Sequence, residues 1–190
     1  ILAVHRLLGF HPDLLVSGIN SGGNLGRNVY YSGTVSAAVE GTLHHIPSMA
    51  VSACGPPFDF SRAAAFAACL AARMIEEGLP DGVTLNVNVP AGWRNGARLT
   101  RLGRSEADSL LSQPGGPASG CVQPEESDSP ADHRLTSHGA AWRPVLTPDS
   151  DYAAVEQGSA SVTPLLLDRT DGRHMEALAR WLEALPATPQ

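Results

Sequence analysis

The stretch from Ser17 to Thr34, SGINSGGNLGRNVYYSGT, restricts what this chain can fold into more than any other part of the sequence. It holds five glycines and three asparagines, contains no acidic residue and directly follows the apolar run LLV. Glycine permits positive φ angles and close approach of the backbone to another group, so the stretch predicts a loop that either binds a ligand or makes a tight connection. The apolar run before it, bounded by Pro12 and Gly18, predicts a buried parallel strand over 13–17.

Helical and strand patterns alternate along much of the chain. The predicted helices cover 1–10, 33–45, about 61–77 and 172–185. The predicted strands that follow the first one cover 48–52, 83–90 and 158–167. This alternation predicts an α/β fold in which a mostly parallel sheet is flanked by helices.

The second half of the chain departs from this alternation. Residues 105–141 are rich in serine, proline, glycine and aspartate and show neither period, which predicts an irregular, extended arm. We therefore divide the chain into a core over 1–104, a divergent arm over 105–149, and a returning strand and C-terminal helix over 150–190. The side chains that this last helix is expected to bury are Met175, Leu178, Ala179, Leu182 and Leu185.

Charge and composition limit the kinds of partner. The formal charge is −6, from 19 acidic and 13 basic residues, and no basic cluster is longer than a pair, so we expect no binding to a nucleic acid duplex. No apolar stretch approaches the roughly 20 residues that a membrane span requires, so we expect no membrane partner. Three cysteines without paired spacing fit a reducing compartment, which predicts a cytoplasmic location. The chain opens at Ile1 inside a helix-like pattern, and we expect a further segment upstream of it.

The place of the glycine-rich loop suggests a phosphate ligand. In open α/β sheets, ligands lie beyond the carboxyl ends of the strands, where loops lead into helix N-termini. Ser32 and Thr34 stand at the predicted helix start, where hydroxyl groups and free backbone N–H groups can bind an anion. No lysine follows the glycines and the dinucleotide glycine spacing is absent, which argues against ATP-type and NAD-type sites. Asn20 and Asn24 suit a hard cation such as Mg²⁺ or Mn²⁺ and phosphate oxygens, although asparagine also favours tight turns for conformational reasons alone.

Other polar residues give weaker signals. His44 and His45 are adjacent, and adjacent side chains on a helix point about 100° apart, so surface or capping roles are favoured over a metal pair. Asp59 and Asp151 are expected in exposed loops, with no role assigned. The chain has no Gly-x-Ser-x-Gly motif, so Ser32 is interpreted as a phosphate-binding group rather than an acyl-transfer nucleophile.

Residues 12–52, PDLLVSGINSGGNLGRNVYYSGTVSAAVEGTLHHIPSMAVS, closely resemble the signature of the SurE family. These stationary-phase survival proteins are metal-dependent 5′/3′-nucleotidases and phosphatases. Two later segments, LNVNVP and SDYAAVEQGSASVTPL, are similar to further parts of the family pattern. With the intervening helices, the resemblance covers about two-thirds of the chain.

The resemblance implies a Rossmann-like core, one divalent metal ion, Mn²⁺ or Mg²⁺, and hydrolysis of nucleoside monophosphates or other small phosphomonoesters. It also implies a homodimer or homotetramer built partly through swapped arms. Carried over by position, Asn20 is the metal ligand, and the residues that bind the phosphate are Asn24, Ser32, Gly33 and Thr34.

The chain departs from the family pattern in two places. The family's other metal ligands, two adjacent aspartates in an NDDG loop and a serine downstream of it, have no match here, and we identify no catalytic residue within this chain. The segment 105–141 does not resemble the corresponding DPRG.PYYW stretch of the family. Two functions therefore stay open: a metal-dependent phosphomonoesterase, and a truncated or degenerate phosphate-binding module without catalysis.

Overall fold

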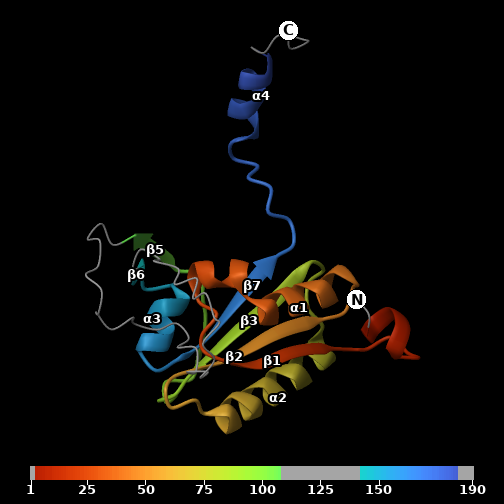
Figure 1. Cartoon of the computed structure of the whole chain (residues 1–190), viewed down its shortest axis with the longest axis vertical. Coiled ribbons are helices and arrows are strands. Elements are labelled where there is room, and N and C mark those ends of the chain that lie inside the picture. Colours follow the sequence, from red (N-terminus) through yellow and green to blue (C-terminus); the bar gives the residue numbers. More distant parts are fainter. Residues whose placement is uncertain (1–2, 108–141, 184–190) are drawn as a thin grey trace, which may run out of the picture.

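The computed structural model describes residues 3–107 and 142–183. A five-stranded sheet has the strand order β1-β2-β3-β7-β4, and a second sheet pairs β5 with β6 (Figure 1). The strands are β1 (Leu15–Ser21), β2 (Ser48–Cys54), β3 (Val83–Pro90), β4 (Ala97–Leu99), β5 (Arg104–Ala107), β6 (Trp142–Val145) and β7 (Ala160–Leu166). The helices are the π-helix η1 (Ala3–Leu7), the 3-10 helix η2 (Gly26–Tyr31), α1 (Gly33–Leu43), α2 (Phe60–Glu77), α3 (Asp151–Glu156) and α4 (Met175–Glu183).

The large sheet is mixed but mostly parallel. β1, β2 and β3 run parallel to one another, β7 pairs antiparallel with β3, and β4 pairs parallel with β7. The strands predicted over 48–52, 83–90 and 158–167 are confirmed as β2, β3 and β7. The expected α/β, Rossmann-like class is confirmed as well.

β1 extends further than predicted. The sequence predicts a strand over 13–17, but β1 runs to Ser21, so the first part of the glycine-rich stretch is strand rather than loop. Asn20 pairs with Ser52 of β2 in the register of the sheet. Sheet pairing uses backbone groups, which glycine and asparagine also carry, so their poor strand propensity is overridden. The loop itself is confined to the residues between Ser21 and the start of η2.

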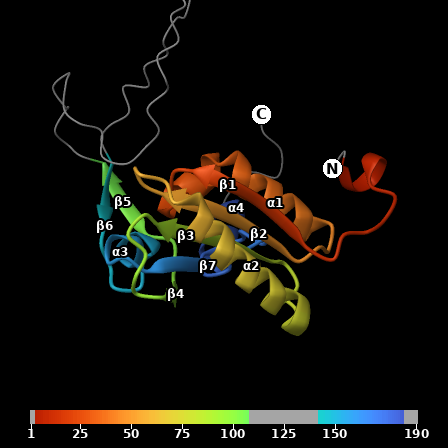
Figure 2. The same cartoon turned by 90° about the horizontal axis from the view of Figure 1, so that it is seen from below.

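The two faces of the large sheet are covered by different helices. Figure 2 shows α1 and α2 on opposite sides of the strands. On the α2 side, Met49 and Val51 of β2 pack with Ala63 and Met74 of α2 in the larger apolar cluster. On the α1 side, a smaller cluster joins Val35 and Ala38 of α1 and Val29 of η2 to Ala50 of β2. The core is therefore larger under α2 than under α1.

β3 carries polar residues on the face that lies under α1. Its odd positions Leu85, Val87 and Val89 belong to the apolar cluster under α2. Its even positions are Thr84, Asn86 and Asn88, and all three are completely buried. Because buried polar groups need hydrogen-bond partners, these side chains determine what can pack on this face.

The C-terminal helix stands away from the sheet (Figure 1). α4 forms where the periodicity predicts it, but no described residue of α4 is buried, and Met175, Leu178 and Leu182 are 56%, 43% and 69% exposed. The predicted burial of its apolar face is therefore wrong within a single chain. Leu185 lies outside the described residues.

The arm predicted to be irregular begins and ends in regular structure. Arg104–Ala107 and Trp142–Val145 pair antiparallel as β5 and β6, so the prediction of irregular structure is wrong at these ends. Residues 108–141 lie outside the described part of the chain. In the parts that are described, no helix combines the length and the apolar character needed to cross a membrane.

Candidate functional site

The candidate site lies where the three parallel strands end. β1, β2 and β3 point their carboxyl ends, Ser21, Cys54 and Pro90, to the same edge of the sheet. The loop after β1 and the first turn of α1 lie at this edge. Ligands of open α/β sheets bind in this position, so the location predicted from the sequence is the one that the fold provides.

A bulge in β1 turns Asn20 toward α1. The register between β1 and β2 shifts between Ser17 and Asn20, and Gly18 within the bulge has φ of +127°. Leu14 and Ile19 both pack into the cluster under α2, although strict alternation would put residues five apart on opposite faces. The extra residue thus moves Asn20 to the α1 face.

On that face, Asn20 meets Thr34 at the start of α1. The Thr34 hydroxyl donates to the Asn20 amide oxygen at 3.5 Å, and the Asn20 amide nitrogen donates to the Gly22 carbonyl oxygen at 2.7 Å. These bonds orient the amide so that its oxygen faces the helix N-terminus. The structure therefore brings together the predicted metal ligand and one predicted phosphate-binding residue.

The first turn of α1 offers groups suited to an anion. Ser32 is the N-cap, and its hydroxyl oxygen accepts from the Val35 N–H at 3.1 Å, which leaves the hydroxyl proton free to donate elsewhere. None of the hydrogen bonds found for the described residues uses the N–H of Gly33 or Thr34. Gly33 is exposed, and a Cβ placed on it would meet nothing within 4 Å. Unpaired N–H groups and the helix dipole together favour a phosphoryl group at this end.

Asn24 lies deeper than the other predicted phosphate-binding residues. It is buried, and its amide nitrogen donates to the Ser52 hydroxyl oxygen at 2.8 Å. Its backbone N–H donates to Asn88 Oδ1 at 2.8 Å, and its carbonyl oxygen accepts from Asn86 Nδ2 at 2.8 Å and Asn88 Nδ2 at 3.2 Å. Asn24 is thus bonded to the sheet beneath the loop, and its contact with phosphate stays a prediction.

Asp151 lies beside the end of the loop, in a position that the sequence did not predict. It was expected in an exposed loop, but it is completely buried as the first residue of α3. Its carboxylate accepts from the N–H groups of Gly26 at 2.7 Å, Gly103 at 2.8 Å and Tyr152 at 2.8 Å. Burial raises the pKa of Asp151, and these three donors offset only part of that shift. The Ser150 N-cap immediately before it was the local signal for a helix start.

Three further residues of the site carried no functional signal in the sequence analysis. Ser52, Asn86 and Asn88 are completely buried, and all three bond to Asn24. Asparagine at positions that face the interior of a central strand is the unusual feature that could have identified two of them.

Cys54 lies at the end of β2 beside this network. Its thiol is 3.9 Å from Asn88 Oδ1, and burial raises its pKa to about 12, with a smaller contribution from the nearby charge of Asp151. The thiol is therefore protonated at neutral pH, which makes it a poor nucleophile. A Cβ on Gly23 would lie only 2.9 Å from its sulfur, so the loop packs closely on this side chain.

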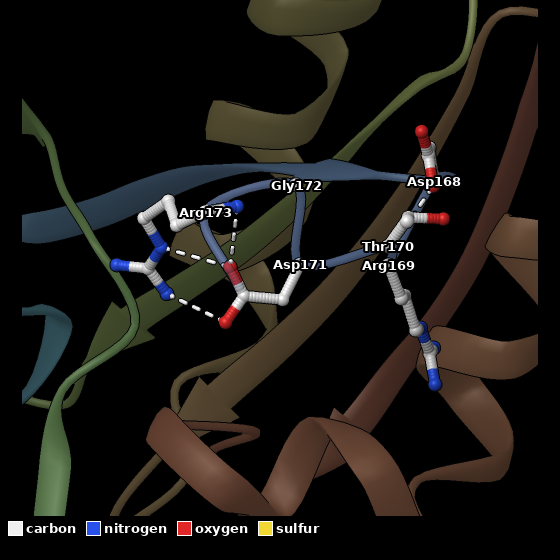
Figure 3. A pocket seen from close by; sticks show the side chains of 6 residues that line it. All are labelled: Asp168, Arg169, Thr170, Asp171, Gly172 and Arg173. Atoms are coloured by element: carbon white, nitrogen blue, oxygen red, sulfur yellow. Dashed lines mark hydrogen bonds and ion pairs between the residues drawn. The ribbon is translucent and has the colours of Figure 1, made fainter. Parts of the chain in front are cut away.

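A hollow elsewhere on the surface offers no comparable chemistry. Figure 3 shows it, lined by residues 168–173 of the segment between β7 and α4. Asp171 in it already accepts from Arg173 Nε at 2.9 Å and pairs with His174 Nδ1 at 2.7 Å. These two partners, Arg173 first, lower the pKa of Asp171 to about 2. Asp171 is thus already paired with basic partners of its own segment.

The described residues supply only part of a cation site. Among them, no group of three or more histidines, cysteines, aspartates and glutamates could hold a metal ion. Asn20 and Thr34 offer neutral oxygens, and a Mg²⁺ or Mn²⁺ ion is normally bound through at least one carboxylate. Asn20 therefore fits one position in a coordination sphere, and the described residues do not complete the rest.

The fold and the site together define a class: a Rossmann-like α/β protein in which a helix N-terminus lies open at the carboxyl edge of the sheet, where proteins of this architecture bind their ligands. The model of a family described as "Survival protein SurE" matches residues 1–109. The chain belongs to the SurE family.

Two curated relatives and one solved structure show the extent of the similarity. The chain is 42% identical to the 5′-nucleotidase SurE of Syntrophotalea carbinolica over 95% of its own length and 68% of that protein. It is 41% identical to the 5′-nucleotidase SurE of Symbiobacterium thermophilum, again over 95% of its length and over 67% of that protein. The crystal structure of the SurE protein from Aquifex aeolicus matches with a TM-score of 0.69 and 30% identity, over 96% of this chain and 70% of that one. The chain thus spans about two-thirds of the length of these relatives.

Proposed function

We propose that this chain binds and hydrolyses phosphomonoesters, with nucleoside 5′- and 3′-monophosphates as substrates. The single observation that carries the proposal is the meeting of Asn20 with the open first turn of α1, where Gly33 and Thr34 present unpaired N–H groups. Helix N-terminal N–H groups stabilise the negative charge on phosphoryl oxygens and hold the phosphorus in a fixed place. The names of the relatives support nucleotides as the phosphate esters in question.

The proposal includes one divalent metal ion, Mn²⁺ or Mg²⁺, with Asn20 as one ligand. The amide oxygen of Asn20 already faces α1, where the phosphoryl group would lie. The carboxylate ligands would have to come from outside the described residues, so we derive no catalytic step through the metal. Within the described part of the chain, the function of the residues is to bind and orient the phosphoryl group.

The test is release of phosphate from AMP with Mn²⁺ present, with and without EDTA. We expect EDTA to abolish turnover, and Asn20→Ala to weaken Mn²⁺ binding at least tenfold in calorimetry. Ser36→Ala, on the exposed side of the first turn of α1, is the matched control and should leave both unchanged. Turnover that persists in EDTA would reject the metal mechanism.

A second candidate function is phosphate binding without catalysis. It is favoured by the lack of an acidic metal-ligand cluster among the described residues. Binding of AMP by the chain, with phosphate release no faster than in a metal-free blank, would support this function over hydrolysis. Measurable Mn²⁺-dependent turnover would exclude it.

We also propose that the chain forms a homodimer or homotetramer, with α4 in the contact. One side of α4 carries Met175, Leu178 and Leu182, which are all exposed in the single chain, with Trp181 beside them. A helix with such an apolar face normally buries it against another surface. Leu178→Glu should shift the mass measured by light scattering toward the monomer, whereas Glu176→Gln should not. Cytoplasmic location stays a prediction.

A further inference from the structure

The end of the loop after β1 and the first residue of η2 are held at three successive residues, Asn24, Leu25 and Gly26, by side chains from distant parts of the chain. Asn88 of β3 binds both backbone groups of Asn24, and the Tyr152 hydroxyl donates to the Leu25 carbonyl oxygen at 3.2 Å. The Asp151 carboxylate accepts from the Gly26 N–H. Backbone groups in loops are normally satisfied by water or by near neighbours, so this degree of fixation is unusual.

The glycine at the end of the loop allows this close packing. Gly26 has φ of +50°, and a Cβ on it would lie 2.5 Å from the Gly103 carbonyl oxygen and 2.6 Å from the ring of Tyr152. The backbone of the loop is therefore pressed against the segment after β4 and against α3. The Asp151 carboxylate links the loop, the segment after β4 and α3, because it accepts hydrogen bonds from the backbone N–H groups of Gly26, Gly103 and Tyr152.

The anchored loop leads directly to the groups that would bind the phosphoryl group. At its start, the Gly22 carbonyl oxygen accepts from the Asn20 amide nitrogen, and this bond orients the Asn20 oxygen toward Thr34. At its end, η2 begins at Gly26 and is followed by Ser32, the N-cap of α1. A shift of the loop would thus change the position of the Asn20 amide and of the first turn of α1 together.

We propose that Asn88 and Asp151 are positioning residues, which fix the loop so that Asn20 and the α1 N-terminus together form one preorganised phosphoryl-binding site. The inference rests on the proposed function, because it explains how this same site is kept ready to bind. Groups that are preorganised need no rearrangement when the ligand arrives, and this increases affinity. Neither residue needs to touch the ligand.

Two substitutions separate this role from general stabilisation. Asp151→Asn keeps an oxygen for the N–H groups of Gly103 and Tyr152, but it places an amide nitrogen against the Gly26 N–H and so detaches the loop alone. Asn88→Leu is close in size and removes both bonds to Asn24. The matched control is Thr84→Val, on the same buried face of β3, which removes a hydrogen bond to Thr42 Oγ1 and none to the loop.

The experiment is a titration of the 190-residue chain with inorganic phosphate, followed by amide NMR. We expect the signals of Gly33 and Thr34 to shift in the parent chain, and the dissociation constant to rise about tenfold in Asp151→Asn and in Asn88→Leu. The side-chain amide signal of Asn20 should move in these two variants even without phosphate. In Thr84→Val, the affinity and the Asn20 signal should stay as in the parent chain, although its melting temperature falls.

The other possible results contradict either the positioning role or the proposed function. Parent-like phosphate affinity in folded Asp151→Asn and Asn88→Leu would overturn the positioning role and leave the proposed function intact. If Thr84→Val loses as much phosphate affinity as Asn88→Leu, the loss is caused by lower stability of the fold. This result would also overturn the positioning role. If the parent chain does not bind phosphate, the proposed function fails, and this inference fails with it. If one of the two variants does not fold, the other decides the question through hydrogen exchange of its Asn24 backbone amide. The positioning role requires this exchange to be faster than in the parent chain, and an unchanged rate would overturn the role.

Discussion

Replacing Gly18 by alanine tests whether the bulge in β1 is fixed by the sheet around it. Gly18 has φ of +127°, which residues with a side chain rarely adopt. A Cβ at this position would run into the main-chain carbonyl oxygen of Val51 on the neighbouring strand and lie 3.2 Å from the Asn20 nitrogen. Both obstacles are backbone atoms of a central sheet, so neither can move aside as a flexible side chain would.

The cost follows from two terms. A residue held in a sparsely populated backbone conformation costs about 1–3 kcal/mol. Forcing an additional carbon into a packed interior costs about 1–3 kcal/mol more. Taking about 4 kcal/mol as the middle of the sum, and roughly 2–4 °C per kcal/mol for a domain of this size, the melting temperature of Gly18→Ala should fall by about 8–16 °C.

Thermal unfolding followed by circular dichroism measures this effect. Gly172→Ala is the matched control, since a Cβ there would meet nothing within 4 Å, and its melting temperature should stay within about 2 °C of the parent value. Because the bulge turns Asn20 toward α1, folded Gly18→Ala should also bind Mn²⁺ more weakly. A melting temperature of Gly18→Ala as close to the parent as that of the control would refute the reasoning, since the bulge would then relax at little cost.

Three further outcomes follow from the burial of individual side chains. Burial raises the pKa of Asp151 above 3.8, so its contribution to stability is fully present below about pH 4 and is lost as the pH rises through the raised value. In urea unfolding at several pH values, the unfolding free energy of the parent chain relative to Asp151→Asn should therefore increase toward acid pH. An increase toward neutral pH would contradict this. Iodoacetamide at pH 8 should label exposed Cys69 in the folded chain but not Cys54, whose pKa is raised to about 12; equal labelling by peptide mass spectrometry would show that Cys54 is accessible. Met74→Ala should lower the unfolding free energy by about 2–5 kcal/mol because Met74 is buried, whereas Met175→Ala should change it by less than about 0.5 kcal/mol in dilute, monomeric protein.

The sequence by itself determined the regular elements of the core. The predicted helix over about 61–77 corresponds to α2, and it ends at Gly78 with φ of +79° as the terminal glycine suggested. Ser32 caps α1 through the Val35 N–H, as its place before the helix predicted. These features depend on residues at most a few positions apart, so a single sequence contains the information needed to predict them. The family signature over 12–52 is local in the same sense.

The tertiary structure alone decided how the candidate site is assembled. Asn88 binds a residue 64 positions earlier in the chain, and Asp151 binds one 125 positions earlier, so no local pattern could reveal either contact. The sequence predicted Asn20 and Thr34 as site residues. Only the bulge at Gly18 brings them to one face, because a slip of one residue reverses every side chain of a strand. The exposed face of α4 has the same cause: its periodicity predicted an apolar side, but only the arrangement of the whole chain shows that no described part of that chain covers it.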